Sequence, residues 1–332
     1  MMSSNIPSPE AFQCNLLHKP ASETTMRPEP VVTVVTVCFN PLKAGRQNLF
    51  AQNLDSVQMQ KGVAVEHLII DGASTDATLD FLKAYDNKHH DIRILSKADS
   101  GIYEAMNRGI ALAKGKYVIF LNSDDFYHRP DGLAISQKAL EESNCSFTFA
   151  PVLPMGAHTH FTHYHHPQNR LHKVFVTSVI PHPSMMYRRG GLVEMGGYDP
   201  TYRIAADYDM TLRLIAAGHK GCFVNHCFAT FVMGGLSTQD EIKELDIREK
   251  IRLVGNAHRE AFGATLSEQE LEFLVTKGCY PRKYLSLYVA SQELVSHAFC
   301  GLPKSMTYRL ARHFNYVKYY IKSFLSSFPG NA

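Results

Sequence analysis

A strand-forming segment that ends in two adjacent carboxylates places the strongest constraint on this chain. The segment is KYVIFLNSDDFY, in which Tyr117 to Leu121 favour a strand and Asp124 and Asp125 follow at its carboxyl end. In open α/β sheets, ligands bind just beyond the carboxyl ends of the strands, so we expect a reaction centre there. Adjacent, accessible carboxylates suit a hard cation such as Mg²⁺ or Mn²⁺. The same Asn-Ser-Asp-Asp sequence is also typical of a turn or a helix N-terminus, so both interpretations stay open.

The chain before this segment contains two further apolar strands. The run VVTVVTVCF, from Val31 to Phe39, is rich in β-branched residues, as expected of a parallel strand that is buried on both faces. A second apolar run covers residues 65–70, and apolar residues between the two runs recur with helical spacing. Together these segments predict a βαβ unit.

Acidic residues follow the strands of this region. Asp71 comes directly after the second strand, and Asp99 follows a short strand that we expect at 93–95. A helix predicted over 102–113 then leads to the strand that ends in Asp124. Strands and helices alternate through residue 150, which predicts an α/β fold with a doubly wound, mostly parallel sheet flanked by helices.

The sequence lacks the phosphate-binding loops of the commonest nucleotide folds. No GxGxxG pattern follows the first strand. The stretch from Gly109 to Gly115 also departs from the P-loop pattern, because Tyr117 follows Lys116 where that pattern has Ser or Thr. Dehydrogenases and P-loop nucleotidases are therefore disfavoured.

The length of the chain indicates one large domain with an appendage. At 332 residues it exceeds a typical single domain. Residues 1–30 are polar and contain several prolines, without the apolar core of a secretory signal, so we expect a disordered tail. We place the α/β domain at 31–240 and a helical C-terminal extension at 241–332.

The amino-acid composition limits the binding partners and the cellular compartment that we expect for this protein. A net charge of +3 is too small for a typical nucleic-acid-binding protein, so nucleic acid is not an expected partner. The seven cysteines include no CxxC pair, which argues against a disulfide framework and for a reducing compartment. No apolar run reaches the roughly 18 residues of a membrane-spanning helix. We therefore expect a cytoplasmic protein.

Histidines alternate in HTHFTHYHH, from His158 to His166. On a strand, alternating residues share one face, so a zinc site is one interpretation of this cluster. No partner cysteine or carboxylate stands at a clear ligand spacing, and the other interpretation is an extended strand that faces an acceptor.

Two acids occupy the first turn of a helix predicted within IAADYDMTLRL. Both Asp207 and Asp209 could complement the helix dipole, and for Asp209 this is our interpretation. Asp207 directly follows the apolar residues Ile204, Ala205 and Ala206. This shelter would raise the pKa of Asp207 toward that of a general base.

A basic, apolar helix is expected over residues 308–328. Leu310, Phe314, Val317 and Ile321 share one face, with Lys318 and other basic residues mostly elsewhere. The pattern fits peripheral binding to a membrane surface, here the cytoplasmic face of the inner membrane. It fits equally a helix that packs against the core.

Several segments together resemble the family 2 glycosyltransferases, which have the GT-A fold. The resemblance covers about residues 31–240 and rests on four stretches: VVTVVTVCFN, HLIIDGASTDAT, ADSGIYEAMNRGIALAKGKYVIFLNSDD and RIAADYDMTLRL. The third is the most specific. The sequence is most similar to bacterial enzymes that build colanic acid, O-antigen or other exopolysaccharides.

The resemblance implies roles for five acids. Asp71 and Asp99 match nucleotide-sugar-binding acids, Asp124 and Asp125 match the DxD-type site for Mn²⁺ or Mg²⁺, with Asp124 also on the donor, and Asp207 matches the catalytic base. Two departures stand out, because many members have Asp at the position of Asn122 and Glu at the position of Ala206.

The implied activity is inverting, metal-dependent transfer of a sugar from a nucleotide-diphosphate sugar to a hydroxyl of a saccharide acceptor, carried on a lipid, in cell-surface polysaccharide biosynthesis. His182, Arg188 and the turn at Gly234-Gly235 are candidate contacts for the acceptor or the diphosphate. A nucleotidyltransferase normally needs a Gly-rich loop after the first strand, which this chain lacks. A non-catalytic nucleotide-sugar-binding scaffold is the alternative, although such a protein would have lost the acids.

Overall fold

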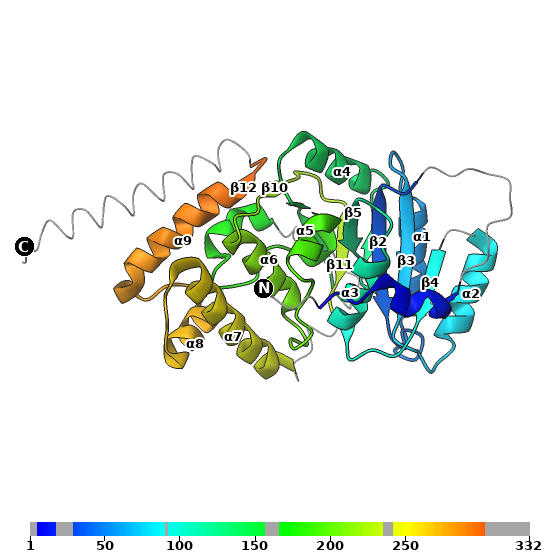
Figure 1. The fold of residues 1–332 in the computed structure, drawn as a ribbon, viewed down its shortest axis with the longest axis horizontal. Coiled ribbons are helices and arrows are strands. Elements are labelled where there is room, and N and C mark those ends of the chain that lie inside the picture. Colours follow the sequence, from blue (N-terminus) through cyan, green and yellow to red (C-terminus); the bar gives the residue numbers. More distant parts are fainter. Residues whose placement is uncertain (1–4, 18–28, 90–91, 157–165, 235–241, 303–332) are drawn as a thin grey trace, which may run out of the picture.

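The computed structural model describes residues 5–17, 29–89, 92–156, 166–234 and 242–302. A large sheet runs through these residues, and helices cover it (Figure 1). Its strands are β1 (Leu16–Leu17), β2 (Val32–Cys38), β3 (Val65–Asp71), β4 (Ile92–Ser96), β5 (Tyr117–Phe120), β7 (Phe147–Phe149), β9 (Met186–Arg188), β10 (Gly221–Phe223) and β12 (Phe299–Cys300). A small second sheet contains β6 (Phe126–Tyr127), β8 (Val152–Met155) and β11 (Ala229–Val232).

The helices lie between and after these strands. They are α1 (Gln47–Gln58), α2 (Thr78–His89), α3 (Ile102–Leu112), α4 (Gly132–Glu142), α5 (Arg189–Glu194), α6 (Ala206–Ala216), α7 (Lys243–Phe262), α8 (Glu268–Lys277) and α9 (Leu285–Ala298). Short 3-10 helices include η1 (Pro9–Asn15), η2 (Pro167–Lys173), η3 (His182–Ser184) and η6 (Arg282–Tyr284). Each helix of the described residues is too short or too polar to cross a membrane.

The main sheet is mixed but mostly parallel. Its strand order is β1-β4-β3-β2-β5-β9-β7-β10-β12. Strands β4, β3, β2 and β5 are parallel neighbours, and so are β7, β10 and β12, whereas β9 runs antiparallel between the two groups. The predicted α/β fold with a mostly parallel sheet and flanking helices is confirmed.

Strand β2 is the centre of the parallel group. All seven of its residues are buried, as its β-branched sequence predicts for a strand with covered faces. Val35 pairs with Leu68 of β3 on one side and with Phe120 of β5 on the other. The carboxyl ends of β3, β2 and β5 therefore lie along one edge of the sheet.

Helix α3 packs closely on β2 because Gly109 has no side chain. A Cβ atom at this position would lie 2.4 Å from Cγ1 of Val35. Helix α3 follows Asp99 and leads into β5. Its position on β2 therefore also affects where Asp99 and β5 lie at the sheet edge. Close approach of a helix to a strand is one of the recurrent uses of glycine.

We expect Gly109→Ala to destabilise the protein by about 1–3 kcal/mol, the usual cost of overpacking a core. Urea unfolding followed by circular dichroism measures this change. Gly190→Ala is the matched control, because a Cβ atom on Gly190, in helix α5, would meet nothing within 4 Å. A stability of Gly109→Ala equal to that of the control would show that α3 can move away without cost.

The N-terminal residues differ from the expected disordered tail. Pro9–Asn15 form η1, and Leu16–Leu17 form β1, which pairs antiparallel with β4. Phe12 is buried, with Lys97 5.1 Å from the centre of its ring. Burial of Phe12 and pairing with the edge strand β4 hold this segment, and neither is evident from its polar composition.

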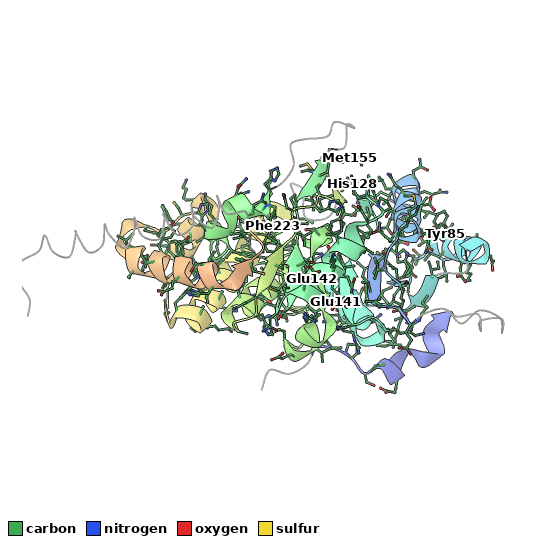
Figure 2. All side chains as sticks on the ribbon, turned by 90° about the horizontal axis from the view of Figure 1, so that it is seen from above. Tyr85, His128, Glu141, Glu142, Met155 and Phe223 are labelled. Carbon is green, nitrogen blue, oxygen red and sulfur yellow. The ribbon has the colours of Figure 1, made fainter. Side chains whose placement is uncertain are left out.

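The helices after residue 242 pack on the same core as the sheet. Leu253 and Val254 of α7 are buried in the core cluster that contains Phe120 of β5, and β12 extends the sheet beyond β10. In Figure 2, Tyr85 lies toward the α2 end of the molecule and Phe223 lies nearer to α9. The expected helix at 308–328 lies outside the described residues, and so does the His158 to His166 cluster except for His166.

Candidate functional site

Three of the predicted acids lie at one edge of the sheet. Asp71 is the last residue of β3, Asp99 follows β4, and Asp124 follows β5. Because β4, β3, β2 and β5 are parallel neighbours, their carboxyl ends share this edge. Ligands bind at this edge in open α/β sheets.

Asp71 is fully buried and holds the edge together. Its Oδ2 accepts hydrogen bonds from the Ser74 backbone N–H at 3.1 Å and from the Ser96 hydroxyl at 2.6 Å. The Ser74 hydroxyl donates to Oδ1. Asp71 therefore links the ends of β3 and β4, and a ligand donor would have to replace one of these serine donors to reach it.

Asn40 joins the loops that follow β2 and β3, and the sequence analysis missed it. Its side-chain oxygen accepts hydrogen bonds from the backbone N–H groups of Thr75 and Asp76 at 2.8 and 3.2 Å. Its own N–H donates to the Ser74 hydroxyl at 2.8 Å. Asn40 has φ +50°, a left-handed conformation that Asn tolerates better than most residues. The Asn-Pro pair at the end of the strand therefore indicates, in the sequence, a turn with a left-handed residue at Asn40.

Phe39 and Asp99 flank the glycine after β3. A Cβ atom on Gly72 would lie 3.0 Å from Oδ2 of Asp99 and 3.3 Å from the Phe39 ring. Phe39 is 65% exposed, whereas Asp99 is half-buried, and burial raises the pKa of Asp99. The pair leaves an open aromatic face beside a carboxylate.

Asp124 forms an ion pair with Arg46, which the sequence analysis also missed. Nη1 of Arg46 contacts Oδ2 of Asp124, and Nη2 donates to the carbonyl oxygen of Gly234. The Asp124 side chain is 13% exposed. Burial raises the pKa of Asp124, and the Arg46 charge opposes that shift.

Asp125 points into the protein from the same turn. It is 1% exposed, and its Oδ1 accepts the Val232 backbone N–H of β11 at 2.8 Å. Its Oδ2 is buried without a hydrogen-bond partner among the described residues, and so is Oδ1 of Asn122. Burial, with a further contribution from the Asp124 charge, raises the pKa of Asp125 well above its ordinary value.

Asp124 at the sheet edge and the unpartnered oxygens of Asp125 and Asn122 in the same turn are donors of the kind that a divalent cation prefers. A buried oxygen without a partner is unfavourable, and Mg²⁺ or Mn²⁺ binds such oxygens. The described residues contain no group of three or more His, Cys, Asp or Glu side chains that would hold a metal by itself. Mg²⁺ typically takes one or two carboxylates and completes its shell with water and substrate phosphates.

Asp207 lies in the first turn of α6, beside a cluster of buried aromatic side chains. Its Oδ1 accepts the Tyr208 backbone N–H at 2.8 Å and lies 3.4 Å from the Tyr103 hydroxyl. Burial and then the Asp207 charge raise the pKa of Tyr103, so this hydroxyl keeps its proton. The hydrogen bonds to Asp207 in the described residues reach Oδ1, which leaves Oδ2 for a ligand.

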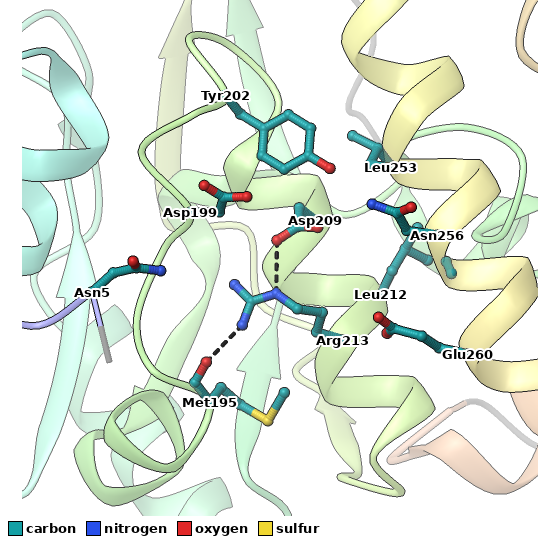
Figure 3. A pocket seen from close by; sticks show the side chains of 11 residues that line it. Asn5, Met195, Asp199, Tyr202, Asp209, Leu212, Arg213, Leu253, Asn256 and Glu260 are labelled. Atoms are coloured by element: carbon teal, nitrogen blue, oxygen red, sulfur yellow. Dashed lines mark hydrogen bonds and ion pairs between the residues drawn. The ribbon is translucent and has the colours of Figure 1, made fainter. Parts of the chain in front are cut away.

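Asp209 faces a different side of the same helix. Its Oδ2 accepts a hydrogen bond from Nε of Arg213 at 2.7 Å, and Arg213 also donates to the carbonyl oxygens of Met195 and Gly197. Figure 3 shows this pair in a pocket of about 270 Å³ between α6 and α7. Asp209 is thus tied to Arg213, while Asp207 contacts Tyr103.

Glu249 of α7 holds the backbone that leads to Asp207. It is buried, and its carboxylate accepts the N–H groups of Arg203, Ile204 and Ala205 at 2.6, 2.9 and 3.0 Å. These three groups precede the first turn of α6, where backbone donors have no partner within the helix. The C-terminal helices therefore position the predicted base.

We expect Glu249→Gln to lower the free energy of unfolding by about 1–3 kcal/mol, because one amide oxygen replaces a charged acceptor of three bonds. Thermal and urea unfolding measure this loss. Glu244→Gln is the control on the same helix, since Glu244 is exposed and its pair with Arg248 should contribute little. Equal stability of the two variants would contradict an anchoring role for Glu249.

The two candidate contact residues, His182 and Arg188, both interact with other parts of the protein. His182 is buried, stacks on Phe120 and lies 3.0 Å from the Tyr198 hydroxyl, and burial lowers its pKa. Arg188 pairs with Tyr117, at the far end of β5 from Asp124, and donates to carbonyl oxygens after α4. Strand register therefore places Arg188 away from Asp124, and its contact with the diphosphate or the acceptor stays a prediction. Of the glycine turn, Gly234 contacts Arg46, and Gly235 lies outside the described residues.

Comparison with solved structures supports the fold. S. aureus TarS residues 1–349, in complex with UDP-GlcNAc, aligns with a TM-score of 0.56 and 14% identity over 83% of this chain and 82% of that one. The mannosyltransferase PcManGT from Pyrobaculum calidifontis, in complex with GDP-Man and Mn²⁺, aligns with a TM-score of 0.54 and 18% identity over 82% and 73%. PcManGT is a mannosyltransferase by name, and at such low identity both structures show the fold alone.

Comparison of sequences identifies the family. The family model described as Glycosyl transferase family 2 matches residues 33–195. A PGL/p-HBAD biosynthesis glycosyltransferase of Mycobacterium bovis is 30% identical over 219 residues, which cover 60% of this chain and 81% of the relative. Chondroitin synthase of Pasteurella multocida is 27% identical over 238 residues, 71% of this chain but 24% of that longer protein. The relative of Mycobacterium bovis is similar over most of its length, and the family model matches the part of the chain that carries the acids at the carboxyl ends of the parallel strands. The chain therefore belongs to glycosyl transferase family 2.

Proposed function

We propose that this enzyme transfers a sugar from a nucleotide-diphosphate sugar to a hydroxyl of a saccharide acceptor, with inversion and with a divalent metal. The observation that carries the proposal is the arrangement of the acids. Asp99 and Asp124 lie at the carboxyl edge of the parallel strands, and Asp207 lies beside aromatic residues that pack on Phe120 of β5. This arrangement supports a donor site and a base at the same end of β5.

The nucleotide would bind along the edge from β4 to β5. The exposed Phe39 ring offers a stacking surface for the base, and the carboxylate of Asp99 lies beside it. Asp71 holds this rim in place through Ser74 and Ser96, and one of these serine donors would have to give way for its carboxylate to accept a donor of the base. Preformed contacts of this kind lower the entropic cost of binding.

The diphosphate would lie at the end of β5. Asp124 and Asp125 would hold the divalent cation, with the Asn122 side-chain oxygen as a further neighbour. When bound, such an ion neutralises the charge that develops on the departing diphosphate. The PcManGT structure with GDP-Man and Mn²⁺ is a precedent for this metal in a protein of the same fold.

Asp207 would act as the general base. As the acceptor oxygen attacks the anomeric carbon, the bond from that carbon to the diphosphate breaks and the hydroxyl proton moves to Asp207 Oδ2. The Tyr208 N–H donates to Oδ1, and the Tyr103 hydroxyl, which donates to the Ile204 carbonyl oxygen, lies 3.4 Å from the same oxygen, while Oδ2 stays available. Attack from the face opposite the nucleotide inverts the anomeric configuration and needs no covalent intermediate on the enzyme.

The acceptor is proposed to be carried on a lipid at the cytoplasmic face of the membrane. Support comes from the resemblance to polymer-building enzymes and from the basic, apolar pattern of residues 308–328. The relatives named for PGL/p-HBAD biosynthesis and for chondroitin synthesis are consistent with a saccharide product.

Transfer is tested by incubating the enzyme and Mn²⁺ with UDP-, GDP- and dTDP-linked sugars and an extract of lipid-linked saccharides. Release of free nucleotide that depends on the extract, and a product whose anomeric configuration in NMR is opposite to that of the donor, would support the proposal. Retention of configuration would contradict inversion. Binding of a donor without turnover with any acceptor would favour the non-catalytic scaffold.

A further inference from the structure

Arg46 connects three segments at the end of β5. It is the residue before α1, its Nη1 forms the ion pair with Asp124, and its Nη2 donates to Gly234 after β11. Its side chain is 29% exposed, whereas that of Asp124 is 13% exposed. The sequence separation of these residues means that the tertiary fold brings them together.

Arg46 is also the cation that balances the two acids in the described part of the chain. The charges that act on Asp124 and Asp125 come from Arg46 and from the two carboxylates themselves. The Val232 N–H donates to Asp125, whereas Arg46 forms its ion pair with Asp124. A divalent cation that approaches Asp124 would therefore meet a positive charge already in contact with the same carboxylate.

We propose that Arg46 is an internal counter-ion that competes with the divalent metal for Asp124 and turns to the diphosphate when the nucleotide binds. This inference rests on the proposed function of the site. A guanidinium and a divalent ion repel each other at one carboxylate oxygen, so the metal alone binds weakly. An arriving diphosphate supplies the negative charge for both cations, and the planar fork of Arg matches phosphate oxygens.

The position of Arg46 favours this exchange. As the N-cap residue of α1, it lies at the positive end of that helix, where an anion is stabilised. Its hydrogen bond to Gly234 would be given up in the exchange. Metal and nucleotide would then bind cooperatively, so that the metal is retained while a donor is present.

The test measures Mn²⁺ binding by the loss of the electron paramagnetic resonance signal of free Mn²⁺, in the absence of nucleotide. Arg46→Gln is expected to bind Mn²⁺ about 10-fold more tightly than the wild type, within the usual range of coupling between sites. It should also lose most of the increase in Mn²⁺ affinity that UDP, GDP or dTDP causes in the wild type. Arg46→Met serves the same purpose if the Gln variant does not fold, and Arg46→Lys, which keeps the charge, should stay as weak as the wild type.

Arg248→Gln is the control, because it removes one positive charge from an exposed pair on α7. Equal Mn²⁺ affinity of Arg46→Gln and Arg248→Gln, with affinity lost in Asp124→Asn, would overturn the counter-ion role and leave the proposed metal site intact. Unchanged Mn²⁺ binding in Asp124→Asn would overturn both proposals. A gain in Mn²⁺ affinity that is confined to the Arg46 variants supports the inference.

Discussion

Asp124→Asn is expected to remove the metal-dependent part of nucleotide binding. The amide keeps the shape of the side chain but loses the charge that attracts a divalent cation, and it leaves Arg46 without its partner. Even outer-shell substitutions at metal sites cost about 10- to 100-fold in affinity, so the loss of a direct ligand should be at least that large. Titration calorimetry with UDP, GDP and dTDP, each with and without Mn²⁺, measures the effect and reveals which base the enzyme binds.

Asp131→Asn is the control for this experiment. Asp131 is a half-exposed acid near the same segment, and it pairs with Arg129 and His226 rather than with Arg46. It should bind nucleotide as the wild type does. If the wild type binds one nucleotide equally well without metal, or if Asp124→Asn binds like the control, Asp124 has no part in holding a metal with the donor.

Asp207→Asn should abolish transfer and leave nucleotide binding nearly intact. A general base typically accelerates its step by about 100- to 10,000-fold, and an amide cannot accept the proton of the acceptor hydroxyl. The donor edge lies on other segments, so calorimetric affinity for the nucleotide should not change. The measurements are the turnover number at saturating donor and the dissociation constant of the nucleotide with Mn²⁺.

Asp209→Asn provides the matched control in the same helical turn. It breaks the pair with Arg213 and should lower the melting temperature, yet keep the turnover number of the folded enzyme close to that of the wild type. A turnover number that falls equally in both variants would point to damage of α6. A parallel loss of turnover and nucleotide affinity in Asp207→Asn would remove Asp207 from the role of base.

The N-terminal half of the fold could be predicted because its signals are local. A run such as 31–39 is apolar over the length of one strand, and helices between such runs require parallel neighbours in the sheet. Asp71 ends its strand, and Asp99 and Asp124 come shortly after theirs. Their position at one edge follows from parallel pairing, without knowledge of any side-chain contact.

Environments of these acids could not be predicted in the same way. Asp71 and Asp99 follow neighbouring strands, yet one is sealed by serines and the other is half-buried beside Phe39. Asp124 and Asp125 are adjacent in sequence, yet one meets Arg46 and the other meets the backbone of β11. Neighbouring residues in a turn point in different directions, and their partners come from distant segments.

The sequence by itself determined the parallel sheet and the set of acids at its carboxyl edge, since strand periodicity and chain order define both. The tertiary structure alone decided that Arg46 faces Asp124 and that Glu249 anchors the start of α6. It also decided, through strand register, that Arg188 lies away from Asp124. Each of these contacts joins residues far apart in the chain, and their hydrogen bonds form because packing of the core brings those segments together.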